Sequence, residues 1–372
     1  MSKIDESAKN RVLVLGKGTS GKAAAMLAGQ KGKAVDFADG YELVVASPGV
    51  RVMSELEYGC RELRRRGTKL LAVTGSKGKS SVVKLVADAL SLAGHEAVPC
   101  GNYGTAVSEV AMRPEVPEWA VVEVSSFMME TTNLPPDTFE AAAVVNLQED
   151  HLDRHGSLAL YHALKRRLLS FAKVAIDGTS LPTGGRRVPK GCYFDNDVLG
   201  ANGAVAAELM RAAGVGGEDV EQAFLAFKPL HHRFELVAEI GGVRFVDDSK
   251  ATSVAALVAG VEMAQGGVRL IAGGLSKGDD PKIARGHLTK RAKKVYLIGQ
   301  CAEEFRAAWA DAVDCEVCGT MERAVEAAMR DAEKGDTVLL SPGTASFDQF
   351  TNFEVRGEVF ASLVKKEGQK TK

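Results

Sequence analysis

Short apolar runs alternate along this chain with longer segments whose apolar residues recur at helical spacing. Near the start, Arg11 to Leu15, Lys33 to Phe37 and Glu42 to Ala46 are runs of strand length, and the last of them stops at Ser47. Such runs, separated by helical patterns, are typical of buried parallel strands. The pattern therefore predicts an α/β protein with mostly parallel sheets.

The same alternation continues to the C-terminus. Further strands are predicted at Trp119 to Val124, Ala141 to Asn146, Val243 to Val246, Val268 to Ile271, Val295 to Ile298 and Thr337 to Leu340. Helices are predicted at Ser157 to Leu169, Val254 to Met263 and Met321 to Asp331, and the basic stretch Arg61 to Lys69 is interpreted as a connector. Because 372 residues exceed what one core usually covers, we expect three domains, residues 1–68, 69–229 and 230–372.

Composition and charge exclude several classes of partner. With 47 basic and 48 acidic residues the net charge is −1, so the chain has no basic field for nucleic acid. It has no run of about 18 apolar residues that could cross a membrane. Met1 to Asn10 lacks the apolar segment of a signal peptide, so we expect a cytoplasmic protein with small-molecule ligands and reduced cysteines. Cys315 and Cys318 have no second pair with which to bind zinc.

A glycine-rich turn follows the apolar run Leu70 to Val73. Residues 74–81 read Thr-Gly-Ser-Lys-Gly-Lys-Ser-Ser, and apolar residues at helical spacing come next. The backbone N–H groups of such a turn and the positive end of the helix form an anion site, where Lys79 would reach phosphate and Ser80 would hold Mg²⁺. Val73 stands where the usual phosphate loop has its first glycine, so this loop is a variant. We predict that it binds ATP through Gly75, Ser76, Lys77, Gly78, Lys79, Ser80 and Ser81.

A second glycine-rich turn, Gly16 to Gly21, follows the first strand. Its G-x-G-x-x-G pattern is also found in proteins that bind NAD, and Asp36 lies at about the offset of the acid that binds ribose. The predicted domain is too short to hold both halves of a dinucleotide site. A nucleoside diphosphate on Gly18, Thr19 and Ser20 therefore fits better than NAD, which remains an alternative.

Acidic and imidazole side chains follow two of the predicted strands. Glu123 comes at the end of an apolar strand, where a carboxylate faces the ligand crevice of an α/β sheet. After the next strand the chain reads Asn-Leu-Gln-Glu-Asp-His-Leu-Asp-Arg-His from Asn146 to His155. We interpret Glu123 and His151 as metal ligands beside the phosphates, rather than as structural residues.

At these positions the chain resembles the Mur ligase family of ATP-dependent amide synthetases, which includes folylpolyglutamate synthase. The similarity covers the phosphate loop, Glu123 to Phe127, Glu149 to Arg154, and two later segments, Pro229 to Glu235 and Asp247 to Thr252. The resemblance implies a short Rossmann-like N-terminal domain that binds a UDP-linked substrate, a central ATPase-type domain and a Rossmann-like C-terminal domain that binds an amino acid. It implies ATP and one or two Mg²⁺ ions as cofactors.

The resemblance also assigns roles to residues that the pattern alone leaves open. Lys165 would be carbamylated by CO₂ and become a metal ligand, although its helix pattern by itself favours a solvated basic face. Lys250 would lie near the γ-phosphate and the acyl intermediate. Arg233, Asp248 and Asn202 would contact ATP, with Asn202 as the one plausible adenine contact because the usual His-Asn-x-x-Asn segment is reduced to Gly200 to Asn202. The remaining contacts to the UDP substrate would be Ser47, Asn102 and Ser125.

The segment from Ser341 to Gly357 resembles the family members that add D-glutamate to UDP-N-acetylmuramoyl-L-alanine. It implies an acceptor site made of Lys277, Thr252, Ser346 and Phe353, in an enzyme of peptidoglycan precursor synthesis. We expect the protein to be a monomer. Without the resemblance, Phe353 could equally be a core aromatic residue and Ser346 a helix cap. A folylpolyglutamate-type ligase, a nucleotide-binding regulator without catalysis and an NAD oxidoreductase remain as alternatives.

Overall fold

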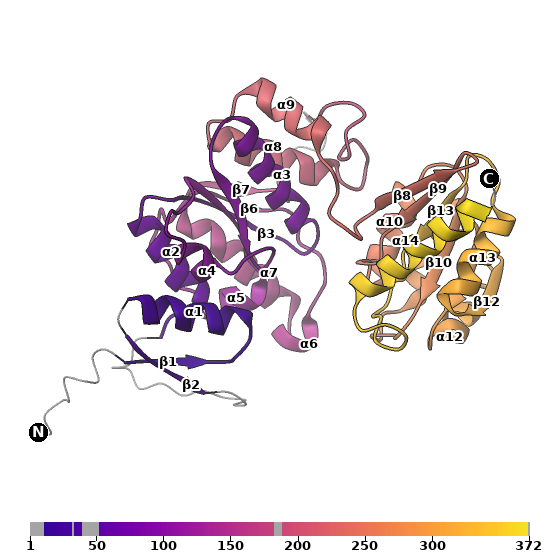
Figure 1. Cartoon of the computed structure of the whole chain (residues 1–372), viewed down its shortest axis with the longest axis horizontal. Coiled ribbons are helices and arrows are strands. Elements are labelled where there is room, and N and C mark those ends of the chain that lie inside the picture. Colours follow the sequence, from indigo (N-terminus) through magenta and orange to yellow (C-terminus); the bar gives the residue numbers. More distant parts are fainter. Residues whose placement is uncertain (1–10, 32, 39–51, 182–187, 371–372) are drawn as a thin grey trace, which may run out of the picture. The chain divides into compact units, whose positions relative to one another are not determined.

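The computed structural model describes residues 11–31, 33–38, 52–181 and 188–370, which fall into two compact units, residues 1–227 and 228–372 (Figure 1). The predicted strand at 42–46 and the predicted substrate contact Ser47 lie outside the described residues. The further division of the first unit at residue 68 stays a prediction. Among the described residues, no helix is both long and apolar enough to span a bilayer.

The first unit begins with a small α/β element. β1 (Arg11–Leu15) and β2 (Ala34–Ala38) pair in parallel and are joined by α1 (Thr19–Gln30). The first turn of α1 requires glycine at residue 21, because a Cβ on Gly21 would lie 2.1 Å from the Gly16 carbonyl oxygen. The stretch interpreted as a connector is largely helical instead, since α2 runs from Glu55 to Arg65 and buries Leu56, Cys60 and Leu63.

The main sheet of the first unit is entirely parallel. Its strands are β3 (Lys69–Thr74), β4 (Ala97–Gly101), β5 (Trp119–Glu123), β6 (Phe139–Val144) and β7 (Ala172–Asp177), in the order β4-β5-β3-β6-β7. The carboxyl ends of parallel strands meet at one edge of a sheet, which is where such folds bind ligands. The loops that follow β3, β5 and β6 therefore come together, and they carry the predicted phosphate and metal residues.

Helices cover both faces of this sheet (Figure 1). The helices are α3 (Lys79–Leu92), α4 (Val107–Ala111), α5 (Ser126–Thr131), α6 (Leu152–His155), α7 (Leu158–Arg167), α8 (Gly200–Ala212) and α9 (Gly217–Ala226), and a 3₁₀ turn at Leu168–Phe171 extends α7. Successive β3 residues point to opposite faces. Leu71 and Val73 pack with α3, α8 and α9, and Leu70 and Ala72 pack with α2 and α4.

The second unit has a six-stranded sheet in the order β12-β11-β10-β13-β9-β8. Its strands are β8 (Glu235–Ile240), β9 (Val243–Asp247), β10 (Val268–Gly273), β11 (Ala292–Ile298), β12 (Cys315–Gly319) and β13 (Thr337–Leu340), and β8 is the one antiparallel strand. Its helices are α10 (Val254–Met263), α11 (Arg285–Arg291), α12 (Ala302–Trp309), α13 (Met321–Asp331) and α14 (Phe353–Lys370), with a 3₁₀ turn at Pro281–Ala284.

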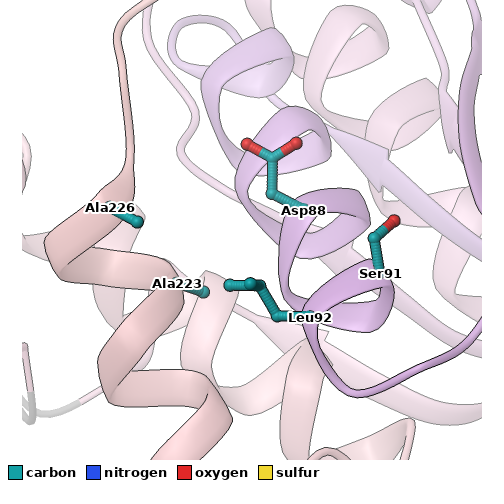
Figure 2. Close-up of a pocket in the computed structure, with 5 residues that line it drawn as sticks. All are labelled: Asp88, Ser91, Leu92, Ala223 and Ala226. Atoms are coloured by element: carbon teal, nitrogen blue, oxygen red, sulfur yellow. The ribbon is translucent and has the colours of Figure 1, made fainter.

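A surface hollow lies between the C-terminal end of α3 and α9 (Figure 2). Its lining residues are Asp88, Ser91, Leu92, Ala223 and Ala226. Because α3 rises about 1.5 Å per residue, the residues of α3 that line this hollow, Asp88 to Leu92, are roughly 14 to 20 Å along the helix from Lys79. The hollow is therefore separate from the phosphate loop.

Candidate active site

The phosphate loop joins the central strand β3 to α3. Gly75 has φ of 156° and Gly78 has φ of 78°, conformations that a residue with a side chain rarely adopts. Gly78 is the N-cap of α3, and no side chain caps this helix. The first amide groups of a helix without a capping side chain are suited to bind an anion. The loop geometry thus supports the phosphate-binding function predicted from its sequence.

Two ammonium groups converge on one carbonyl of this loop. Lys79 Nζ donates to Gly75 O at 2.9 Å and to Ser76 O at 3.2 Å. Lys165 Nζ, from α7, donates to the same Gly75 O at 2.9 Å. The structure therefore brings Lys165 to the phosphate loop, across 90 residues of sequence.

Lys165 is buried, with an exposed fraction of 2%. Its Nζ lies 4.5 Å from the centre of the Tyr161 ring. Burial, reinforced by the positive charge of Lys79, lowers the pKa of Lys165 to about 7. The alternative that Lys165 belongs to a solvated basic face is therefore wrong.

Glu123 ends β5 beside the loop and is 2% exposed. Its Oε1 accepts a hydrogen bond from Asn102 Nδ2 at 2.7 Å, and its buried Oε2 has no hydrogen-bond partner among the described residues. A buried carboxylate oxygen without a donor is costly unless a cation compensates for it. Mg²⁺ prefers oxygen ligands, so Glu123 fits the metal site that its position in the sequence predicted.

His151 lies at the N-cap of α6 with φ of 53°, and its side chain is 45% exposed. Its ring centre is 5.0 Å from that of Phe127 and 6.2 Å from that of Tyr161. The neighbouring Asp150 pairs with Lys77 Nζ at 3.2 Å. The exposed imidazole next to an ion pair could ligate a metal ion at the edge of the site.

The predicted contacts to the UDP substrate lie at two places in the first unit. Gly18, Thr19 and Ser20 form the start of α1, which no side chain caps, and Asp36 is exposed on β2. Asn102 and Ser125 lie at the ends of β4 and β5, where Ser125 Oγ accepts from Met128 N at 3.2 Å. The hydrogen bond between Asn102 and Glu123 was not anticipated and shows that Asn102 orients a candidate metal ligand.

Predicted nucleotide residues of the second unit gather at the start of β8 and the end of β9. Asp248 is partly buried, and its oxygens accept from Ser341 Oγ at 2.8 Å and from Phe234 N at 3.2 Å. Burial raises the pKa of this carboxyl to about 7. Arg233 lies between two residues with left-handed backbone, His232 at 60° and Phe234 at 51°.

Side chains of His232, Glu235 and Asp247 are close enough together to resemble a metal site. His232 Nδ1 and Asp247 Oδ2 are 2.6 Å apart, and this hydrogen bond raises the pKa of His232. A Cβ on Gly357 would lie 2.1 Å from His232 Nδ1 and 2.5 Å from Asp247 Oδ2. The pair is thus enclosed by α14, and we interpret it as an ion pair.

The predicted acceptor residues share one end of the second unit. Lys250 Nζ lies 3.6 Å from the centre of the Phe353 ring. A bridge between Leu275 and Ala345 sets the turn of the exposed Lys277 beside the turn of the buried Ser346. Thr252 is half-buried and follows Lys250 by two residues. The second unit therefore holds these predicted acceptor residues on adjoining turns.

Sequence reasoning missed Arg356, which organises this region. The side chain is fully buried in α14, and burial lowers its pKa to about 10. It donates to the backbone oxygens of Ser249 at 2.8 Å, Thr344 at 3.2 Å and Ala345 at 3.3 Å, and to Ser249 Oγ at 2.9 Å. Arg356 thus links the Lys250 segment to the Ser346 turn, which spacing along the sequence does not reveal.

Together, the phosphate loop after a central parallel strand, the buried lysine and the unpaired carboxylate define an α/β protein of the phosphate-loop class. Comparison with family models is more specific. The model described as Mur ligase middle domain matches residues 73–179, and the model described as Mur ligase, glutamate ligase domain matches residues 232–343.

Relatives match most of the chain. A UDP-N-acetylmuramoylalanine--D-glutamate ligase of Acidobacterium capsulatum is 32% identical over 95% of this chain and 96% of its own length. A protein of the same description from Nitratidesulfovibrio vulgaris is 35% identical over 89% of this chain and 83% of its own length. The chain therefore belongs to the Mur ligase family, as its sequence motifs predicted.

Solved structures have the same fold. The MurF ligase of Thermotoga maritima in complex with ADP superposes with a TM-score of 0.67 at 16% identity, covering 99% of this chain and 98% of that one. FolC of E. coli in complex with ADP gives a TM-score of 0.59 at 15% identity, covering 86% and 96%. These similarities confirm the predicted α/β fold class.

Proposed function

We propose that this protein is an ATP-dependent ligase that joins D-glutamate to UDP-N-acetylmuramoyl-L-alanine in peptidoglycan precursor synthesis. The observation that carries the proposal is the description shared by relatives that are 32% and 35% identical over most of both chains. The phosphate loop and the buried residues around it support ATP as the energy source. We place the reaction in the cytoplasm and expect a monomer.

The chemistry follows from the low reactivity of a carboxylate. The carboxylate of the alanyl group would attack the γ-phosphorus of ATP, which forms an acyl phosphate and releases ADP. The amino group of D-glutamate would then attack the acyl carbon, which forms the amide and releases phosphate and a proton. Phosphoryl transfer depends mainly on positioning and charge, so the protein needs no covalent nucleophile. Lys79 and the loop amides would hold the triphosphate.

The residues present fit a magnesium site. Within the part of the chain that the structure describes, Glu123 offers a buried oxygen that accepts no hydrogen bond, and Ser80 and His151 are the other candidate ligands. Bound Mg²⁺ would neutralise phosphate charge in the transition state. In this arrangement Asn102 fixes the Glu123 carboxylate, so the free oxygen keeps its orientation.

Lys165 suits carbamylation. At a pKa of about 7, a large share of the side chain is a neutral amine at neutral pH. The amine nitrogen would form a bond to the carbon of CO₂ and lose one proton, which leaves a carbamate anion. That anion would become a further metal ligand and would replace a cation with an anion next to Lys79.

The remaining roles rest on the family resemblance. Lys277, Thr252, Ser346 and Phe353 would bind D-glutamate, with Lys277 pairing with a carboxylate. Lys250 would stabilise the γ-phosphate and the acyl phosphate, and Arg233, Asp248 and Asn202 would contact ATP. The UDP group would lie on Gly18, Thr19, Ser20 and Asp36, on Asn102 and Ser125, and on Ser47.

The deciding experiment measures phosphate release with ATP, Mg²⁺ and UDP-N-acetylmuramoyl-L-alanine. D-glutamate is compared with L-glutamate, L-lysine and meso-diaminopimelate, and a Lys79→Ala variant is the catalytic control. We expect release with D-glutamate alone, and loss of it in the variant. Phosphate release in a separate assay, with a folate substrate in place of UDP-N-acetylmuramoyl-L-alanine and with L-glutamate, would favour the folylpolyglutamate-type alternative. ATP binding without release in any mixture would instead favour a regulator.

A further inference from the structure

The side chain of Asn146 holds the middle of the phosphate loop. Asn146 lies just beyond β6, and its Oδ1 accepts a hydrogen bond from Lys77 N at 2.9 Å. Its Nδ2 donates to Lys77 O at 3.0 Å. The backbone adds a third bond, because Ser76 N donates to Asn146 O at 3.0 Å. Asn146 therefore makes three hydrogen bonds to the loop, two through its side chain and one through its backbone.

A second amide side chain lies against the loop from another direction. Asn202, in α8, is 5% exposed, and its Oδ1 accepts from Asn146 Nδ2 at 3.3 Å. Its Nδ2 lies 2.2 Å from the point that a Cβ on Gly78 would occupy. Because Gly78 is also left-handed, with φ of 78°, the path of the loop requires glycine at that position, and Asn202 packs against it.

The chemistry of the amide explains why asparagine is needed at residue 146. Each of the two Nδ2 protons has an acceptor, Lys77 O or Asn202 Oδ1, and the Oδ1 atom has a donor in Lys77 N. An aspartate has the same shape but no protons to donate, so one of its oxygens would face two acceptors. The expected penalty for such a contact is at least that of the lost hydrogen bonds.

We propose that Asn146 and Asn202 are positioning residues that keep the phosphate loop in its binding conformation before a nucleotide arrives. The proposal rests on the proposed function only in taking a nucleoside triphosphate as the ligand of the loop. When the loop is already ordered in the free protein, no part of the binding free energy is spent on ordering it. If a substitution leaves the loop correctly shaped only about a tenth of the time, affinity falls about tenfold.

This role differs in a measurable way from the adenine contact expected for Asn202. An adenine contact strengthens the binding of ATP but not of inorganic tripolyphosphate, which has no base. A brace on the loop strengthens the binding of both ligands by the same factor. The two ligands therefore separate the two roles within one variant.

The experiment compares the full-length protein with its Asn146→Asp and Asn202→Ala variants. Asn133→Asp, at an exposed residue, makes the same charge change elsewhere in the first unit. Calorimetry with ATP and with tripolyphosphate, both with Mg²⁺ and without the other substrates, gives the two affinities. We expect Asn146→Asp to weaken both about tenfold or more, Asn202→Ala to weaken both severalfold and equally, and Asn133→Asp to change neither.

A second measurement does not depend on any ligand. Amide hydrogen exchange over residues 74–80 in the free protein should be faster in both loop variants and unchanged in Asn133→Asp. Unaltered exchange together with unaltered affinities in folded variants would overturn the proposal. Weaker ATP binding alone in Asn202→Ala would assign that residue to adenine instead. If the unsubstituted protein binds neither ligand, the proposed function fails, and hydrogen exchange still tests the brace.

Discussion

Lys165 gives the sharpest prediction, because its burial sets the amount of reactive amine. An ordinary lysine, with a pKa of about 10.4, is neutral in only about one molecule in 2500 at pH 7. With its pKa lowered to about 7, about half of the Lys165 side chains are neutral at that pH. The neutral form is thus enriched about a thousandfold. We expect carbamylation to rise with pH through about 7 and to flatten above pH 8.

The assay measures carbamate and activity on the same samples. Enzyme depleted of CO₂ is titrated with ¹³C-bicarbonate at pH 6, 7 and 8, and the carbamate carbon is followed by NMR while phosphate release is measured. Lys165→Ala should lose at least 99% of the activity, and a short carboxylate such as acetate should restore part of it. Lys165→Arg, which keeps the positive charge, should stay inactive whether bicarbonate or acetate is added.

Two results would refute this reasoning. The first is a fully active enzyme that shows no carbamate signal under any of these conditions. The second is a Lys165→Ala variant that remains folded, as judged by thermal melting, and whose low activity does not respond to acetate. Either result would mean that Lys165 has a purely structural role, as a buried hydrogen-bond donor to the Gly75 carbonyl of the loop.

Three further substitutions test the geometry of the two units. Glu123→Gln should lower Mg²⁺-dependent phosphate release at least a hundredfold. The melting temperature without Mg²⁺ should stay equal or rise, because the substitution removes a buried charge with an unpaired oxygen. A large loss of stability without metal would argue that the carboxylate is structural. Asp248 has a pKa raised from 3.8 to about 7, so its contribution to stability is lost as pH rises from about 4 to about 7, by roughly 4 kcal/mol. Asp248→Asn should abolish this decline, as urea unfolding at several pH values will show, and an unchanged pH profile would contradict the raised pKa. Arg356→Lys keeps the charge but cannot make all four hydrogen bonds, so the second unit should lose about 3 kcal/mol of stability and the KM for D-glutamate should rise more than that for ATP. Equal changes in the two KM values would mean that Arg356 only supports the fold.

Local patterns were sufficient to predict the central strands of both large sheets, although the outer strands β4, β7, β8 and β12 were not predicted. β3 is buried on both faces, so its residues form the continuous apolar run that is typical of a central parallel strand. The phosphate loop was equally clear, because its glycines and lysine are adjacent in sequence. Helix α2 was missed although Leu56, Cys60 and Leu63 recur at helical spacing, because its many charged residues gave the segment the appearance of a connector.

The contacts that shape the site could not be predicted in this way. Lys165 reaches Gly75 across 90 residues, and Arg356 reaches Ser249 across 107. Side chains that cross such separations leave no periodic signal in the sequence. Asn146 was visible as part of a polar run after a strand, but its pairing with Lys77 depends on two adjacent strands whose order only the fold defines.

The hydrogen bonds of the Lys79 ammonium group affect which anions the phosphate loop can bind tightly. Its ammonium is already engaged by two carbonyl oxygens of its own loop. An incoming anion shares the ammonium with those oxygens, so it gains more when it also engages the loop amides and the end of α3. A chain of phosphates spans all of these groups, whereas chloride or a single phosphate reaches few of them. We therefore expect the loop to prefer a polyphosphate to chloride or a single phosphate, because a polyphosphate engages more donors at once.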